Sequence, residues 1–210
     1  ATGGSTMFET WPQPNRLAAT LGHLNHETCK THNMLKLTRH LFCWTANPTY
    51  GDFYERALFN GILGTQGPQP GELQYYVAMA SGYPRTFGTP DNSFWCCYGT
   101  SVESFAKLGD SIYFQAPGKL YVNLYIPSHL DWAEQGVQVE MKTDYPREDT
   151  VRLHLSMVAP KSFALSLRVP HWVSGDVEAR VNGAPAGPLD VKRTDTKSAS
   201  WLTLERTWND

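Results

Sequence analysis

The stretch Phe94-Trp95-Cys96-Cys97-Tyr98-Gly99-Thr100 places two adjacent thiols among aromatic residues, and an apolar helical pattern opens directly after it, near Ser101. Thiols at the start of a helix are well placed to ionise, because the helix dipole and the free backbone amides favour negative charge there. A disulfide between adjacent cysteines would strain the peptide that joins them. We therefore expect Cys96 and Cys97 to be thiolates, which act as nucleophiles and as metal ligands.

A second set of candidate ligands, Glu27-Thr28-Cys29, lies far upstream in the sequence. One carboxylate and three thiolates are a donor set that suits a four-coordinate zinc ion. Positions i and i+2 of a regular helix point about 200° apart, so Glu27 and Cys29 can share an ion only if Glu27 lies before the helix or in its first turn. Asn25 is a candidate N-cap nearby. The alternatives are that Glu27 only stabilises a helix N-terminus and that Cys29 is a core residue.

The fourth cysteine, Cys43, lies in the same predicted helix as Cys29, about 21 Å further along its axis, so the two cannot bind one metal ion. We expect Cys43 to be a small buried hydrophobic residue. Disulfides among the four cysteines are the alternative.

Glu9 lies in the apolar and aromatic segment Thr6-Met7-Phe8-Glu9-Thr10-Trp11. Such surroundings raise the pKa of a carboxyl group towards that of a general acid. A solvated surface carboxylate is the alternative. Three histidines, His26, His32 and His40, show no metal-binding spacing, and we expect them at the polar surface of a helix.

The period of the apolar residues changes along the chain. Three-to-four spacing predicts helices, and alternation predicts half-buried strands. The helices cover residues 27–46, 50–64 and roughly 100–110, and the strands cover 120–126, 137–141, 151–158, 163–169, 177–181 and 201–206. Asn182-Gly183 predicts a tight turn. Helices followed by strands indicate an α + β protein of two domains, 1–115 and 116–210, the second an antiparallel β-sandwich.

Composition limits the classes of function. The formal net charge is −2, which gives no reason to expect a nucleic-acid partner, and no apolar run is long enough to span a membrane. The 7 Trp, 10 Tyr and 9 Phe suit sugar-binding faces and equally suit an ordinary core. The chain starts without Met and stops directly after a strand-like run, so we expect it to be a fragment of a larger protein.

The thiol motifs occur in order with three further segments, Asn33-Met34-Leu35-Lys36-Leu37, Tyr54-Glu55-Arg56-Ala57-Leu58-Phe59-Asn60 and Leu120-Tyr121-Val122-Asn123-Leu124-Tyr125-Ile126-Pro127-Ser128. Together they resemble the β-L-arabinofuranosidases of glycoside hydrolase family 127, to which family 146 is related. The resemblance implies the C-terminal part of an (α/α)6 toroid, the catalytic domain, over 1–115, followed by a truncated antiparallel β-sandwich over 116–210.

The resemblance also implies a zinc ion held by Glu27, Cys29, Cys96 and Cys97. The first cysteine of the adjacent pair is the nucleophile in the family, which corresponds to Cys96.

The acid/base glutamate of the family corresponds to Glu9, although the spacing from Glu9 to Glu27 is slightly longer than is usual there. A substrate-contacting tyrosine corresponds to Tyr75, although Ala78 stands where the family has proline. The family's histidine contacts to the sugar lie upstream of this chain, so we expect the site to be incomplete here.

The activity implied by the resemblance is release of terminal β-L-arabinofuranose, with retention, from an oligosaccharide or glycan. The alternatives are a non-catalytic carbohydrate-binding sandwich with a structural zinc and a hydrolase of another rare sugar. Neither nucleic acid nor a membrane is an expected partner, and zinc-bound thiolates favour a reducing, cytoplasmic compartment.

Overall fold

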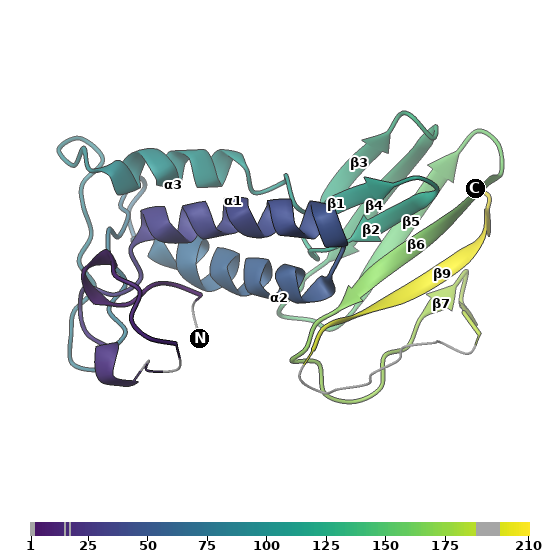
Figure 1. Cartoon of the computed structure of the whole chain (residues 1–210). Coiled ribbons are helices and arrows are strands. Elements are labelled where there is room, and N and C mark those ends of the chain that lie inside the picture. Colours follow the sequence, from purple (N-terminus) through teal and green to yellow (C-terminus); the bar gives the residue numbers. More distant parts are fainter. Residues whose placement is uncertain (1–2, 15, 17, 188–197) are drawn as a thin grey trace. The chain divides into compact units, whose positions relative to one another are not determined.

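Helices come first along the chain and strands follow (Figure 1). The computed structural model describes residues 3–14, 16, 18–187 and 198–210. The chain divides into two units, of which unit 1 comprises residues up to 46 and 52–108, and unit 2 comprises 47–51 and 109–210. The α + β class expected from the sequence is confirmed, whereas the toroid and the sandwich stay predictions.

Unit 1 holds most of the helical structure. Its longer helices are α1 (Thr28–Thr45), most of α2 (Pro48–Ala57) and α3 (Cys96–Ala106), and its short helical turns are η1 (Met7–Glu9), η2 (Ala18–Thr20), η3 (Leu58–Ile62) and η4 (Leu63–Thr65). α1 packs against α3 and against η3. A left-handed residue, Ala46, ends α1, and Pro48 begins α2 at a position where a missing amide hydrogen costs little.

Three expectations for this unit are wrong. His26 and His32 are buried rather than on the polar surface of a helix, whereas His40 is exposed as expected. His26 Nε2 lies 3.0 Å from Thr31 Oγ1, and His32 lies between Ser104 and Glu103, so polar partners offset the cost of burial. Cys43 is exposed and not a core residue, because it lies on the outer face of α1.

Unit 2 contains all the named strands. They are β1 (Tyr113–Ala116), β2 (Lys119–Val122), β3 (Ser128–Trp132), β4 (Val137–Thr143), β5 (Val151–Met157), β6 (Lys161–Val169), β7 (Arg180–Val181), β8 (Ala184–Pro185) and β9 (Ser200–Trp208). One sheet has the order β1-β2-β6-β9, another β3-β4-β5, and β7 pairs with β8. The two larger sheets contact each other through Trp132 and Phe163, whose ring centroids are 5.4 Å apart.

The strand pairing corrects the expectation of a purely antiparallel arrangement. β2 and β6 pair in parallel, while the other pairs of named strands are antiparallel. Parallel neighbours need a long crossover connection, and here the whole β3-β4-β5 sheet forms it. The predicted turn at Asn182-Gly183 is confirmed, since both residues have positive φ and join β7 to β8.

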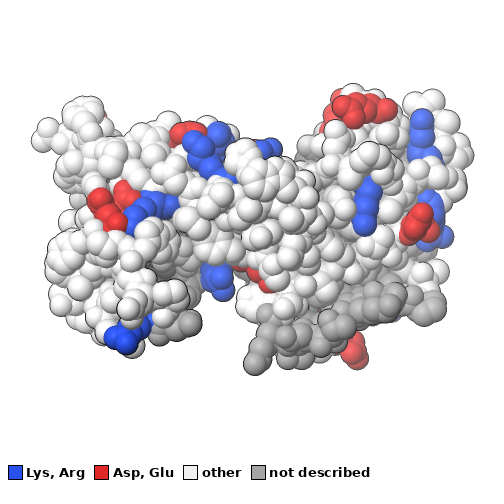
Figure 2. Space-filling view, viewed as in Figure 1, with Lys and Arg blue, Asp and Glu red and all other residues white. Residues whose placement is uncertain are grey.

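Charged side chains are dispersed over the face of the molecule shown in Figure 2, where basic and acidic groups lie in small separate clusters. Within the described residues, no helix combines the length and the apolar character needed to cross a membrane.

Candidate functional site

Glu27 lies directly before α1 and is its N-cap. Its backbone is extended, and its side chain accepts hydrogen bonds from the amides of Cys29, at 3.1 Å, and Lys30, at 2.6 Å. Asn25 is therefore not the cap; its side chain instead bonds to the backbone of Gly22 and Thr20. Glu27 thus meets the geometric condition for sharing an ion with Cys29.

The two adjacent cysteines are the first residues of α3, which begins five residues before the Ser101 start expected from the apolar pattern. Cys97 is buried and Cys96 is exposed. Trp95 is the N-cap of α3 and makes no side-chain hydrogen bond to its free amides. Both cysteines therefore lie in the first turn of α3, at the positive end of the helix dipole.

The beginnings of α1 and α3 meet in a cluster of four candidate ligands, Glu27, Cys29, Cys96 and Cys97, whose donor atoms all lie within 4.8 Å of one another. Cys29 Sγ lies 3.3 Å from Cys97 Sγ, and Cys97 Sγ lies 3.0 Å from Glu27 Oε1. None of these cysteines is in a disulfide, so the disulfide alternative is wrong.

The donor set of this cluster fits a zinc ion. Burial raises the pKa of Cys29 to about 12 and, together with the hydrogen bond to the Glu27 carboxylate, raises the pKa of Cys97 well above its usual range. Crowded sulfur atoms beside a carboxylate thus keep their protons unless a cation compensates their charges. Three thiols and one carboxylate are ligands that zinc prefers, and Zn–S bonds of about 2.3 Å require sulfur atoms as close together as these.

Glu9 lies at the end of η1, in a turn where Phe8 and Glu9 both have positive φ. Lys30 Nζ donates to the Glu9 backbone carbonyl oxygen and lies 4.9 Å from the centroid of the Trp11 ring. A residue at the start of α1 therefore holds the Glu9 turn beside the cluster.

The carboxylate of Glu9 accepts hydrogen bonds from two phenols. The hydroxyls of Tyr76 and Tyr75 donate to its Oε1 atom at 2.7 and 2.8 Å. These bonds, that of Tyr76 first, lower the pKa of Glu9 below its usual value. The expectation that apolar neighbours raise this pKa is wrong, because Glu9 is exposed and its charged form is hydrogen-bonded.

Tyr75 connects this carboxylate to the cysteine pair. Its oxygen lies 3.7 Å from Cys96 Sγ, which donates to it, while its own hydrogen goes to Glu9. The hydrogen bond to Glu9 raises the pKa of Tyr75, so its hydroxyl stays protonated. The backbone of Tyr75 is held at the start of α1 by Thr28, whose amide and hydroxyl both donate to its carbonyl.

The structure thus brings the six sequence-predicted site residues together: Glu9, Glu27, Cys29, Tyr75, Cys96 and Cys97. Sequence reasoning missed Tyr76 and Lys30, which hold Glu9 in place. The tandem tyrosines were the available signal, but their hydrogen bonds to Glu9 join residues 66 and 67 positions apart, which local sequence patterns do not predict.

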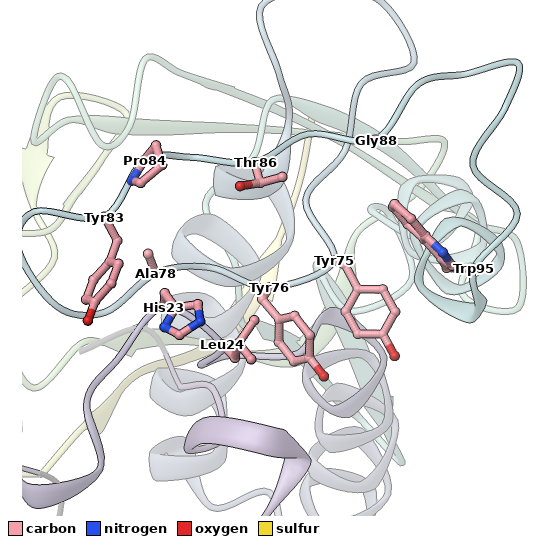
Figure 3. A pocket seen from close by; sticks show the side chains of 10 residues that line it. All are labelled: His23, Leu24, Tyr75, Tyr76, Ala78, Tyr83, Pro84, Thr86, Gly88 and Trp95. Carbon is pink, nitrogen blue, oxygen red and sulfur yellow. The ribbon is translucent and has the colours of Figure 1, made fainter.

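A pocket of about 360 Å³ adjoins the tyrosines (Figure 3). It is lined by His23, Leu24, Tyr75, Tyr76, Ala78, Tyr83, Pro84, Thr86, Gly88 and Trp95. Sequence reasoning did not predict it.

Two family models match the sequence. Residues 1–110 match the catalytic domain of the GH127 β-L-arabinofuranosidases, and residues 119–210 match the middle domain of the same enzymes. No curated protein matched the sequence.

Solved structures share the fold. A GH127 β-L-arabinofuranosidase from Geobacillus stearothermophilus T6 superposes over 100% of this chain with a TM-score of 0.74 and 24% identity. A further GH127 β-arabinofuranosidase covers 99% of the chain at 0.78 and 22%, and a protein described as a glycoside hydrolase covers 100% at 0.74 and 23%. The chain spans only 34%, 34% and 37% of the lengths of these three proteins.

Proposed function

Because this chain belongs to glycoside hydrolase family 127, we propose that it carries the nucleophile, the acid/base residue and the metal ligands of a retaining glycosidase that releases terminal β-L-arabinofuranose. The observation that carries this proposal is the Tyr75 hydroxyl, which contacts both Cys96 Sγ and Glu9 Oε1 at the edge of the four-ligand cluster.

Cys96 is the proposed nucleophile. It is the exposed member of the cluster, whereas Cys97 is buried and Cys29 is half-buried. Glu27, Cys29, Cys96 and Cys97 would hold the zinc ion, which when bound keeps the thiols ionised at neutral pH. A sulfur atom that is both ionised and open to solvent can reach the anomeric carbon of a sugar.

Glu9 is the proposed acid/base residue. In the first step, Cys96 Sγ forms a bond to the anomeric carbon while the leaving oxygen takes a proton from Glu9. In the second step, Glu9 accepts a proton from water, and the water oxygen replaces sulfur at the same carbon, so the configuration is retained. The contacts of one hydroxyl with both groups support this assignment, because they place the proposed nucleophile and the proposed acid/base residue beside each other.

The protonation of Glu9 changes between these steps. The two tyrosine hydroxyls favour its carboxylate, the form required as the base in the second step. For the first step, the sugar's leaving oxygen would take the place of a tyrosine hydroxyl at Glu9, which returns the pKa of the carboxyl group towards its usual value.

A purely structural zinc site in a carbohydrate-binding protein is the competing function. Structural sites have four ligands closed off from reacting groups. Here one candidate ligand is exposed and connected through Tyr75 to an exposed carboxylate, which favours catalysis.

Replacement of single cysteines in the intact enzyme tests the proposal. We expect Cys96→Ser to abolish hydrolysis of a β-L-arabinofuranoside, because the serine hydroxyl is a far weaker nucleophile. The matched control, Cys43→Ser, changes an exposed cysteine outside the cluster and should leave turnover within about twofold. Equal losses in the two variants would exclude Cys96 as the nucleophile.

A further inference from the structure

The aromatic pocket, defined by the ten lining residues given above, adjoins the proposed acid/base residue. Figure 3 shows Tyr75 and Tyr76 side by side, with Trp95 at one end of the pocket and Tyr83 at the other. The two tyrosines line the pocket and also bond to Glu9 through their hydroxyls. A ligand in the pocket would therefore lie next to the residues that hold the Glu9 carboxylate.

The lining of the pocket indicates an uncharged ligand. None of the ten residues is Lys, Arg, Asp or Glu, so an acidic sugar or a phosphate would find no counter-charge. Four of the ten are Tyr or Trp, whose faces suit the C–H surface of a sugar ring. The imidazole of His23 and the hydroxyl of Thr86 supply a few polar groups, as small-molecule sites require.

The floor and the walls of the pocket are held in place without a ligand. Backbone hydrogen bonds join the segment that carries Ala78 to the segment that carries His23 and Leu24. The amide of Val77 donates to the carbonyl of Asn25 at 3.0 Å, and the amide of Met79 donates to the carbonyl of Gly22 at 2.9 Å. At one end His23 stacks on Tyr83 with centroids 5.0 Å apart, and at the other Trp95 meets the Tyr75 ring edge-on at 6.0 Å. Such a pre-formed pocket loses little conformational entropy when it binds.

A glycine lets the wall approach closely. A Cβ atom at Gly88 would lie 1.9 Å from the Tyr98 hydroxyl, which is hydrogen-bonded to the Leu73 carbonyl oxygen. The end of the 83–88 segment can therefore lie this close to Tyr98 because residue 88 has no side chain.

We propose that the aromatic pocket binds the neutral sugar on the leaving-group side of the scissile bond. A general acid donates its proton to the leaving oxygen, so the sugar beyond that oxygen must lie near Glu9. The aromatic pocket has this position. The inference rests on the function proposed above, and it adds that the preferred substrate is a disaccharide or longer chain whose second residue carries no charge.

The test compares two substrates of the intact enzyme: methyl β-L-arabinofuranoside, which has no second ring, and a neutral disaccharide that carries the same terminal sugar. Tyr83→Ala removes one wall of the aromatic pocket. We expect it to lower the ratio of kcat/KM for the disaccharide to kcat/KM for the methyl glycoside about tenfold. The matched control is Trp44→Ala, which removes an exposed aromatic side chain of α1 and should leave this ratio unchanged. An unchanged ratio in Tyr83→Ala would overturn the proposal.

Calorimetric titration separates the two proposals. In the Cys96→Ser background, which cannot turn the substrate over, the disaccharide should bind about tenfold more weakly when Tyr83→Ala is added. One outcome is that the unaltered enzyme hydrolyses neither substrate while Tyr83→Ala still weakens binding of the disaccharide in the Cys96→Ser background. In that case the proposed function fails and the aromatic pocket stands. If hydrolysis proceeds and binding is insensitive to Tyr83→Ala, the proposed pocket fails alone.

Discussion

Two phenol hydrogens on one oxygen atom decide which protonation state Glu9 prefers. Hydrogen bonds from Tyr76 and Tyr75 stabilise the carboxylate and leave its neutral form without that benefit. Held in this way, Glu9 is ionised at rest, and in the proposed mechanism it takes up the proton of a general acid when a substrate displaces a donor. Tyr76, which the sequence motifs did not single out, is thus as important for Glu9 as Tyr75.

Tyr76→Phe is expected to move the pH profile of the intact enzyme. Loss of one donor raises the pKa of Glu9, so Glu9 keeps its proton to higher pH. The alkaline limb of the pH profile of kcat/KM reports the pKa of the general acid in the free enzyme. The midpoint of this limb should move to higher pH by about half to one unit. Steady-state rates across pH provide the measurement. Tyr113→Phe, which removes a phenol bonded to Ser128 in unit 2, is the control and should leave the limb in place.

The metal content of purified protein should depend on Cys97. Its sulfur atom lies against both Cys29 and Glu27, so Cys97→Ala removes a central ligand. We expect about one zinc ion per chain in the parent protein and at least a tenfold loss of zinc affinity in the variant. Elemental analysis and competition with a chelator measure both quantities. Retention of full zinc content by Cys97→Ala would contradict the ligand assignment, whereas Cys43→Ala should retain it.

At the scale of elements, the site depends on where two helices begin. α1 begins after Glu27 and α3 begins at Cys96, and the contact between the helices brings these two ends together. Both are positive ends of helix dipoles, which stabilise the negative charge that a cluster of metal ligands concentrates. Glu27 therefore caps a helix and is a candidate ligand at once, because its position before α1 is the one that the sequence required for sharing an ion with Cys29.

The π-helical turn η3 packs against α1 and against the residue that precedes Glu27. At Gly61 a Cβ atom would lie 2.5 Å from the ring of buried His26, whose Nε2 atom bonds to Gly61 O and to Thr31. Close approach of η3 to the chain that leads into Glu27 thus requires glycine.

Gly61→Ala should destabilise the protein by about 1–3 kcal/mol and lower the midpoint of thermal unfolding by several degrees. The clash with His26 outweighs the better helix propensity of alanine. Circular dichroism of the helices follows the transition. Gly64→Ala is the matched control, because its Cβ would lie no closer than 3.5 Å to a neighbour; an equal loss of stability there would show that backbone freedom, not the clash, is responsible.

At the scale of the whole molecule, the candidate site belongs entirely to unit 1. The ligands, Glu9, the tyrosines and the aromatic pocket all lie within residues 9–97 of that unit, while unit 2 supplies the sheets. A metal ion that binds only the folded cluster stabilises the unit that contains the cluster.

Removal of metal by a chelator should therefore destabilise unit 1 and leave unit 2 largely unchanged. Amide hydrogens in the first turns of α1 and α3 should exchange at least tenfold faster after chelation, whereas those of β4 and β6 should change little. Hydrogen-exchange mass spectrometry reads both sets in one experiment. Equal loss of protection in the strands would mean that the ion stabilises the whole chain.

The local elements were largely predictable because they follow from the spacing of apolar residues. The helix over 27–46 and the turn at Asn182-Gly183 formed as expected. β3 was missed, since its alternating pattern is interrupted by polar residues such as His129 and Asp131. His32 was misplaced because a helical period does not tell which polar residue faces another helix, and His26 because it lies before α1, against Gly61 of η3.

By itself, the sequence determined the chemistry of the site: three thiols and a carboxylate in two short motifs, each at a helix start, with a further glutamate upstream. Only the tertiary structure decided which groups meet, including the two phenols on Glu9, the contact between Tyr75 and Cys96, and the aromatic pocket. The physical reason is one of range. Capping and periodicity act over a few neighbouring residues, whereas these contacts join segments about twenty to seventy positions apart, which only the packing of helices and loops brings together.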